Sequence, residues 1–250
     1  MARWETITGE LREAIIRGEI APGTTLPRET DLEERYGASR TTVRRAVEEL
    51  EAEGLVEKVR RRGTVVRRSP ARTRLTRSRR VYRDDIGYFF DRTAQGWRAL
   101  ETPTITRVPA PADVARLLGV EPGGDVTARS RIMGEPDTGE ATQVAVSYLS
   151  PDAVAELPVL AEPDTGPGGI YDRMEEAGHS PLEWEEAISA RMPSPEEARL
   201  LALAPGVPVL RIVRTTRTPG GRVLEVNATV LSAERFEIGY AIDRDTSATP

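Results

Sequence analysis

The stretch Ser-Arg-Thr-Thr-Val-Arg-Arg-Ala-Val-Glu-Glu-Leu, residues 39–50, decides how the first part of the chain folds. Its apolar residues recur at the spacing of one face of an α-helix, at Val43, Ala46, Val47 and Leu50. Ser39 stands where a hydroxyl caps a helix N-terminus, and Gly54 follows where a helix ends. The segment therefore predicts a helix with one buried face, whose other face begins with arginine and threonine.

Two shorter helical patterns precede this segment, and a hairpin pattern follows it. The first has an apolar residue at every fourth position and predicts a helix over about 6–17. The second is expected to begin at Pro27 and to end at Gly37. Apolar residues at 55–56 and 64–66 flank a basic tip, which predicts a two-stranded hairpin. Three helices and then a hairpin are the elements of a winged helix-turn-helix domain.

The exposed side chains of the predicted third helix suit DNA. Arginine can donate two hydrogen bonds to one guanine, and threonine offers a hydroxyl and a methyl group. DNA-reading helices present such side chains to the major groove from their N-terminal turns. Here those turns hold Arg40, Thr41, Thr42, Arg44 and Arg45. The alternative is a three-helix bundle whose surface is rich in arginine.

The distribution of charge favours a polyanionic partner for this end of the chain. The 250 residues carry a net charge of −5, yet residues 1–80 hold 19 basic and 13 acidic side chains. From Lys58 to Arg80 there are 11 basic residues and no acidic one. A basic block at one end of an acidic protein indicates a nucleic-acid partner, and a solvated basic linker is the alternative.

Residues from about 5 to 68 resemble the GntR family of winged-helix transcriptional regulators. The resemblance rests on Leu26-Pro27, residues 39–46, residues 50–56 and Arg62-Gly63-Thr64. It implies a homodimer on a pseudo-palindromic operator in double-stranded DNA, with each copy reading one half-site. It also implies DNA contacts from the residues matching Ser39, Arg40, Thr41, Thr42 and Arg44 and from the hairpin tip. The expected DNA-binding residues of this chain are Arg28, Thr30, Ser39, Arg40, Thr41, Thr42, Arg44, Arg45, Arg61, Arg62 and Gly63.

Two departures from the family pattern affect these contacts. After Leu-Pro the family usually has Ser-Glu-Arg, whereas this chain has Arg28-Glu29-Thr30. The family's arginine is therefore missing, and we expect Arg28 to substitute for it. The hairpin tip is usually Gly-Arg-Gly, whereas this chain has Arg61-Arg62-Gly63, which favours phosphate contact over entry into the minor groove.

The second half of the chain contains an internal repeat. Residues 115–123 resemble residues 198–206 at an offset of 83, and each segment reads as a short helix closed by Pro-Gly. An alternating strand pattern follows each, at 126–132 and 209–215. Further strands are predicted at 104–108, 143–149, 185–191 and 223–231, with a helix over about 170–177. This pattern predicts an α+β domain with a mainly antiparallel sheet and pseudo-twofold symmetry.

This half resembles UTRA, the ligand-sensing domain of the HutC subfamily of GntR regulators, which has a chorismate-lyase-like fold. The matching segments are residues 129–131, 147–151, 170–176 and 225–227. The resemblance implies a small-molecule effector lying on the sheet, with an anionic group held by the arginines. The expected effector-binding residues are Tyr88, Phe89, Arg129, Arg131, Ser147, Tyr171, Glu225 and Asn227.

The residues themselves support an anionic group in the effector. Arg129 and Arg131 are two apart on a predicted strand, so both side chains leave the same face. Two guanidinium groups repel unless an anion lies between them, and arginine suits carboxylate or phosphate. Pairing with acidic residues of the domain is the alternative. The resemblance also shows a departure. Sugar-phosphate sensors of the HutC subfamily have small hydroxyl residues where this chain has Gly-Tyr-Phe-Phe at 87–90 and Gly168-Gly169, which favours a larger, flatter ligand.

Composition excludes several other functions. The chain has no cysteine and one histidine, which excludes thiolate sites and histidine metal clusters. It has neither a run as long as a membrane span nor a signal-peptide pattern, so we expect a cytoplasmic protein without a membrane partner. The adjacent pairs Glu175-Glu176 and Glu185-Glu186 point apart and make poor acid–base dyads. We therefore expect no metal, no cofactor and no enzymatic activity.

The predicted organisation has three parts. Residues 1–68 form the winged helix-turn-helix domain, residues 69–81 a linker, and residues 82–250 the effector-binding and dimerisation domain. The expected function is sequence-specific regulation of transcription, as a repressor that a small molecule releases from DNA. The alternatives are a chorismate-lyase-like enzyme and a non-specific DNA-binding protein.

Overall fold

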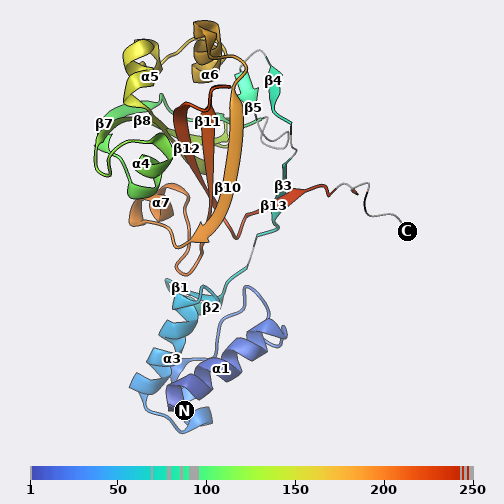
Figure 1. Ribbon diagram of the computed structural model, residues 1–250. Coiled ribbons are helices and arrows are strands. Elements are labelled where there is room, and N and C mark those ends of the chain that lie inside the picture. The colour runs from blue at the N-terminus through green and yellow to red at the C-terminus, as the bar shows by residue number, and fades with distance from the viewer. Residues whose placement is uncertain are drawn as a thin grey trace. The chain divides into compact units, whose positions relative to one another are not determined.

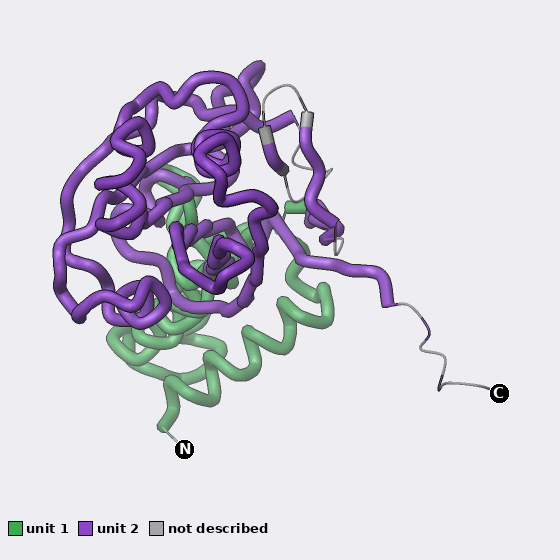
Figure 2. The backbone as a smooth tube through the Cα atoms, turned by 45° about the horizontal axis from the view of Figure 1, so that its top comes forward, with its two compact units in different colours: residues 1–71, 202–208 green, residues 72–201, 209–250 purple. Residues whose placement is uncertain are grey.

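The computed structural model describes residues 2–68, 70–77, 80–84, 87–89, 96–242, 244 and 247. The chain divides into two compact units (Figure 2). The first comprises residues 1–71 with 202–208, and the second comprises residues 72–201 with 209–250.

The first unit has the expected three helices and hairpin (Figure 1). Its elements are α1 (Arg3–Ile16), α2 (Glu29–Tyr36), α3 (Arg40–Ala52), β1 (Val56–Val59) and β2 (Gly63–Val66). Ser39 caps α3 as predicted, because its Oγ accepts a hydrogen bond from the backbone N–H of Thr42 at 3.3 Å. The helix α2 begins two residues later than Pro27.

The core of this unit takes one face of each helix. The predicted stripe of α3 is buried, with Val43, Ala46 and Leu50 fully covered. The other core residues are Ile7, Leu11, Leu26, Leu32, Val47, Val56 and Val66. Burial of this stripe fixes the rotation of α3 about its own axis, so its arginine-bearing face is turned outward.

The second unit is built on one antiparallel sheet with the order β10-β11-β12-β9-β8, and both β6 and β7 pair with β8. Its strands are β6 (Arg98–Ala99), β7 (Thr104–Pro109), β8 (Asp125–Glu135), β9 (Glu140–Leu149), β10 (Glu183–Arg191), β11 (Val209–Arg217) and β12 (Val223–Ser232). All of the strands predicted from the sequence are present. This antiparallel sheet with its helices confirms the α+β class.

The internal repeat corresponds to two equivalent halves of the sheet. One half is β7, α4 (Ala112–Leu118), β8 and β9, and the other is β10, α7 (Pro195–Leu200), β11 and β12. The two helices begin 83 residues apart, at 112 and 195. Because β9 pairs with β12 at the centre, each half lies on its own side of the sheet, as a pseudo-twofold relation requires.

The two faces of the sheet are covered differently (Figure 1). Residues of α4 pack against Val126, Val213 and Val226 on one face. The opposite face meets two groups of elements. One group is α5 (Pro151–Glu156), the 3₁₀ turn η2 (Pro158–Ala161), α6 (Gly169–Met174) and the π turn η3 (Glu175–His179), which share a cluster with Leu149. The other is the parallel pair β3 (Thr73–Arg77) and β13 (Phe236–Tyr240), which packs on Ile212 and Leu231.

Two elements near the start of this unit were not predicted. The strand β3 lies within residues 69–81, whose polar, arginine-rich composition suggested only a linker. Leu75 anchors it, because this side chain is only 2% exposed and packs with Phe236. The second element is a short hairpin of β4 (Tyr82–Asp84) and β5 (Gly87–Phe89).

Candidate DNA-binding and effector-binding sites

The N-terminal turns of α3 present the predicted DNA-binding side chains to solvent. Arg40, Thr41, Arg44 and Arg45 are exposed, and Thr42 is half-buried. The hydroxyls of Ser39 and Thr42 lie 2.9 Å apart. Arg28 and Thr30 are also exposed, at the start of α2. The unit therefore places most of the predicted residues on the surface around the beginning of α3.

Glu29, which was not among the predicted residues, joins the two central arginines. Its carboxylate accepts a hydrogen bond from Nε of Arg40 at 3.1 Å and from Nε of Arg44 at 3.0 Å. Burial alone would raise the pKa of Glu29, but these two arginines outweigh it and the net shift is downward. Both contacts use Nε, so the terminal guanidinium nitrogens remain available to bases. Because the arginine side chains are 65% and 51% exposed, these ion pairs are weak and can open.

Arg45 lies apart from this pair. Its guanidinium stacks on the ring of Trp4 in α1, 4.3 Å from the ring centroid. The predicted contact residue Arg45 therefore has an intramolecular partner on a different side of the helix from Arg40 and Arg44.

The hairpin tip has an unusual backbone. Arg61 adopts a φ of 67°, the left-handed conformation that glycine favours, and Gly63 follows with a φ of 90°. Arg62 donates a hydrogen bond to the carbonyl of Gly23 at 3.3 Å, which orients it across the tip. Left-handed backbone costs a non-glycine residue roughly 1–2 kcal/mol. Arg61 therefore puts a charged side chain where the family pattern has glycine, while the backbone of the turn keeps the left-handed conformation that glycine favours.

The strand register brings the predicted effector residues onto one face of the second unit. Residues directly opposite one another in a sheet point to the same side. One row across five strands reads Glu186, Arg214, Asn227, Ser147 and Arg129. Two residues along the strands, a second row contains Trp184, Thr216 and Glu225. Two residues along in the opposite direction, Arg131 lies opposite Ala145 and shares this face.

Three of these side chains form a hydrogen-bonded network with Thr229. Arg131 donates from Nη2 to Oγ of Ser147 at 2.8 Å, and Asn227 donates to the same oxygen at 3.1 Å. Thr229 donates to the amide oxygen of Asn227 at 2.8 Å. Ser147 is fully buried, and Asn227 is nearly so. The Nε of Arg131 is buried without a hydrogen-bond partner among the described residues.

The two arginines of the Arg-x-Arg strand differ in their contacts. Arg129 is 6% exposed and donates to the backbone carbonyls of Glu162 and Pro163. Burial and then the nearby Arg131 lower the pKa of the Arg129 guanidinium. Within the described parts of the chain, no carboxylate forms an ion pair with either arginine. The alternative of internal neutralisation therefore does not apply among these residues.

Arg214 is the counterpart of Arg131 in the other half of the repeat, 83 residues later, and it is neutralised. Its Nη2 lies 2.6 Å from Oε1 of Glu186. Burial lowers the pKa of Arg214, but Tyr171 and Glu186 outweigh it, so the pKa is raised overall. The repeat thus contains Arg214, which has an internal carboxylate, and Arg131, which has none among the described residues.

Glu225 is the acidic group of the same face. It is fully buried, and its Oε2 accepts hydrogen bonds from Tyr171 and Thr216, each at 2.8 Å. Burial, and then the negative charge of Glu225, raise the pKa of Tyr171, so this phenol remains a donor. The second oxygen of Glu225, Oε1, is buried without a partner among the described residues. An unsatisfied buried carboxylate oxygen is costly, which makes it a position for a ligand donor.

Three aromatic rings lie beside Glu225. Tyr88 and Tyr171 were predicted, and their ring centroids are 6.1 Å apart. Trp184 lies 5.5 Å from Tyr88 and 5.7 Å from Tyr171. Trp184 also packs on the cluster around Leu149. The side chain of Phe89 lies outside the described part of the structure.

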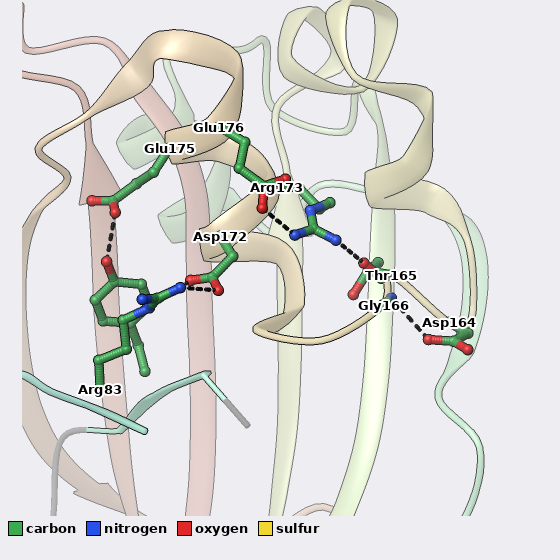
Figure 3. A network of polar contacts seen from close by, with 9 residues as sticks. Arg83, Asp164, Thr165, Gly166, Asp172, Arg173, Glu175 and Glu176 are labelled. Atoms are coloured by element: carbon green, nitrogen blue, oxygen red, sulfur yellow. Dashed lines mark hydrogen bonds and ion pairs between the residues drawn. The ribbon is translucent and has the colours of Figure 1, made fainter. Parts of the chain in front are cut away.

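The β4–β5 hairpin is tied to α6 by polar contacts (Figure 3). Arg83 of β4 donates to Asp172 of α6 at 2.6 Å. Tyr88 of β5 donates to Glu175 at 2.5 Å, and burial together with this bond raises the pKa of Tyr88 to about 12. On the other side of α6, Arg173 donates to the carbonyl of Thr165 at 3.0 Å. These contacts hold α6 beside the aromatic rings.

Other kinds of site are not evident among the described residues. An open pocket lined by Thr106, Thr127 and Val154 lies beside α5, and none of the predicted effector residues lines it. No helix in the described part is long and apolar enough to cross a membrane. The described residues also contain no cluster of acidic, histidine or cysteine side chains that could hold a metal ion.

The comparisons with known proteins agree with both units. A family model for bacterial regulatory proteins of the gntR family matches residues 4–66, and one for the UTRA domain matches residues 100–237. An uncharacterized HTH-type transcriptional regulator of Streptomyces coelicolor is 39% identical, over 95% of this chain and 91% of that protein. The HTH-type transcriptional repressor NagR of Bacillus subtilis is 26% identical, over 95% and 93%. A crystal structure described as a GntR-family regulator has a TM-score of 0.69 at 28% identity, covering 98% and 99%.

A winged helix-turn-helix unit joined to a separate ligand-binding domain defines a DNA-binding transcriptional regulator. The chain belongs to the GntR family of bacterial regulatory proteins and carries a UTRA domain. This membership confirms the predicted fold class and the predicted function as a regulator. The family consists of regulators, so the alternative of a chorismate-lyase-like enzyme is set aside.

Proposed function

We propose that this protein is a cytoplasmic, homodimeric repressor of the HutC subfamily. It binds a pseudo-palindromic operator and leaves it when an anionic small molecule binds the UTRA domain. The proposal of an effector site rests on the face of the sheet that bears Arg131, Ser147 and Glu225. On it Arg131 and Glu225, of opposite charge, each retain a buried polar atom that has no hydrogen-bond partner among the described residues.

The DNA-reading part rests on Arg40 and Arg44. Both are exposed at the start of α3, and Glu29 holds both by Nε, so their terminal nitrogens can donate to a guanine. Arg61 and Arg62 of the hairpin tip suit phosphate contacts, as do Arg28 and Thr30 beside α2. Arg45 has Trp4 as a competing partner, so we assign it a smaller contribution.

Binding assays on DNA fragments selected from random sequence test this assignment. Replacing Arg40 or Arg44 by alanine should cost about 1–3 kcal/mol of operator binding and relax preference at one base pair. Replacing Arg62 should weaken binding uniformly across sequences and reduce its salt dependence. A uniform loss for Arg40→Ala would make Arg40 a phosphate contact instead. Selection of no common sequence would support the alternative of a non-specific DNA-binding protein.

The effector proposed here has two chemical ends. An anionic group would accept from Arg131, and a hydroxyl or amino group would donate to Oε1 of Glu225. The rings of Tyr88, Tyr171 and Trp184 favour a flat apolar portion near Glu225. The relatives NagR of Bacillus subtilis and the mannosyl-D-glycerate system repressor MngR of Escherichia coli are repressors by name, which supports the proposal that this chain represses transcription.

A thermal-shift screen of small organic acids with the full chain tests the effector proposal. An effector is expected to raise the melting temperature and to release the selected DNA fragment. Arg131→Met and Glu225→Gln should each abolish both responses. Retention of both responses in the two variants would contradict the proposed site.

A further inference from the structure

The pocket beside α5 combines an apolar lining with two opposite charges. It has a volume of about 420 Å³, and small-molecule sites usually have volumes of about 300–1,000 Å³. Its charged residues are Arg107 on β7 and Asp125 on β8, and Val154 of α5 lies on its apolar side. The apolar lining also includes Ile105, Pro151, Ala155 and Ala161.

The two charged groups of the pocket do not neutralise each other. Arg107 lies opposite Thr127, and Asp125 is two residues from Thr127 along β8, so the three side chains share one face of the sheet. Diagonal neighbours of this kind are roughly 7–8 Å apart. Neither Arg107 nor Asp125 forms a side-chain hydrogen bond or an ion pair with a described residue. By contrast, Arg211 of the same sheet pairs with Asp113 at 2.6 Å.

The internal repeat indicates that the fold does not require these charges. At the offset of 83 residues, Arg107 corresponds to Ala190 and Asp125 corresponds to Pro208. The strand register is also equivalent, because β10 pairs with β11 in the same alignment as β7 with β8. The same strand pairing therefore forms with alanine and proline at these positions, so the sheet itself needs neither charge.

The two halves of the repeat also differ in what covers this place. In the second half Leu210 and Ile212 belong to an apolar cluster with Phe236 of β13. Their counterparts in the first half are Thr127 and Arg129. Thr127 lines the pocket, whose walls come from α5 and η2. One half thus has a packed apolar position where the other has a polar pocket.

We propose that this pocket binds an amino acid with an aliphatic side chain, as a ligand distinct from the effector. The carboxylate of the amino acid would accept hydrogen bonds from the guanidinium of Arg107, whose geometry suits a carboxylate. The ammonium group would donate to the carboxylate of Asp125. The aliphatic side chain would lie on Ile105 and Val154. A zwitterion carries both charges on one small group, and it therefore matches an arginine and an aspartate on the same face.

Isothermal titration of the full chain with L-leucine tests the site. Binding at millimolar concentration is expected. Two analogues should bind about tenfold more weakly, namely 3-methylbutylamine, which lacks the carboxylate, and 4-methylpentanoate, which lacks the ammonium group. Equal binding of either analogue would overturn the assignment of a zwitterion, and a wild-type chain that binds no leucine would overturn the site.

Substitutions in the pocket locate the binding. Arg107→Ala and Asp125→Asn should each weaken leucine binding about tenfold. Arg116→Ala, at an exposed arginine of α4 on the other face of the sheet, is the matched control and should leave binding unchanged. Ala155→Trp should block the pocket, whereas Ala112→Trp, at the exposed start of α4, should not affect binding. Unchanged binding in Arg107→Ala and Ala155→Trp would reject the pocket.

Arg131→Met separates this pocket from the effector face. Leucine binding should survive in this variant, because Arg131 does not line the pocket. Loss of binding in Arg131→Met together with retention in Arg107→Ala would place leucine on the effector face and overturn the inference. The inference goes beyond the proposed function, which does not involve the pocket. Its failure would therefore leave operator binding and the response to the effector intact.

Discussion

The paired arginines of the internal repeat yield a quantitative prediction about stability. Arg214 is 12% exposed in its side chain and neutralises Glu186, which is 21% exposed. Removing one partner of a buried ion pair costs about 3–5 kcal/mol, because the other charge stays behind unpaired. Arg77 lies 3.8 Å from the same carboxylate oxygen and offsets part of this loss. We therefore expect Arg214→Met to destabilise the second unit by about 3 kcal/mol.

Arg131→Met should have a much smaller effect on stability. Arg131 has no carboxylate partner among the described residues and donates one hydrogen bond, to Ser147. Loss of that bond costs about 1 kcal/mol, and relief of repulsion with Arg129 offsets some of it. The two substitutions remove the same side chain from equivalent positions of the repeat, so their difference reports the ion pair.

Scanning calorimetry of the full chain measures this difference. For a domain of this size, 1 kcal/mol corresponds to roughly 2–4 °C in the midpoint of unfolding. The midpoint of the second unit should fall by about 6–12 °C in Arg214→Met and by less than about 4 °C in Arg131→Met. Arg211→Met, which breaks the more exposed pair with Asp113, is a control with a small expected effect. Equal losses for Arg131 and Arg214 would refute the assignment of Arg131 as the ligand-binding member.

Three further predictions concern other contacts. Glu29→Gln should weaken operator binding several-fold, because Arg40 and Arg44 lose the carboxylate that orients them. The substitution also removes a negative charge near DNA, so tighter operator binding would show that orientation by Glu29 is unimportant. The pKa of Tyr88 is raised to about 12 in the folded chain, whereas it is about 10 in the unfolded chain. This difference stabilises the fold fully below about pH 10, and the stabilisation is lost as the pH rises to about 12. Thermal melts from pH 9 to 12 should therefore show a steeper loss for wild type than for Tyr88→Phe, and parallel curves would contradict this. Gly168→Ala should lower the stability of the fold more than Gly221→Ala. Both glycines have a left-handed backbone, but only at Gly168 would the new Cβ lie 1.7 Å from a carboxylate oxygen of Asp172. Equal losses by calorimetry would mean that Asp172 moves aside freely.

Local patterns were sufficient for the first unit. The spacing of Val43, Ala46 and Leu50 predicted which face of α3 is buried, and hence that Arg40 and Arg44 are exposed. This works because helical periodicity depends only on residues within two turns of one another. Glu29 escaped prediction because its contacts with Arg40 and Arg44 join two helices, and no local pattern specifies which residues of α2 lie beside α3.

The effector face was only partly readable in the sequence. Alternation along a strand predicted that Arg129 and Arg131 share a face, and the repeat predicted a symmetric sheet. Alternation does not determine which residue of one strand lies opposite which residue of another. The rows that unite Trp184, Glu225 and Arg131 depend on the register of strands far apart in the chain.

The sequence by itself thus determined the two-domain plan, the buried side of each helix and the alternation of each strand, because these follow from contacts between near neighbours. Only the tertiary structure decided that, among the described residues, Arg214 is neutralised while Arg131 is not, and that Glu225 keeps one oxygen unpaired there. It also decided that residues 73–77 form a strand, since Leu75 gains burial only against β13 and the sheet. Long-range pairing makes these choices, and its energy depends on residues that no local window contains.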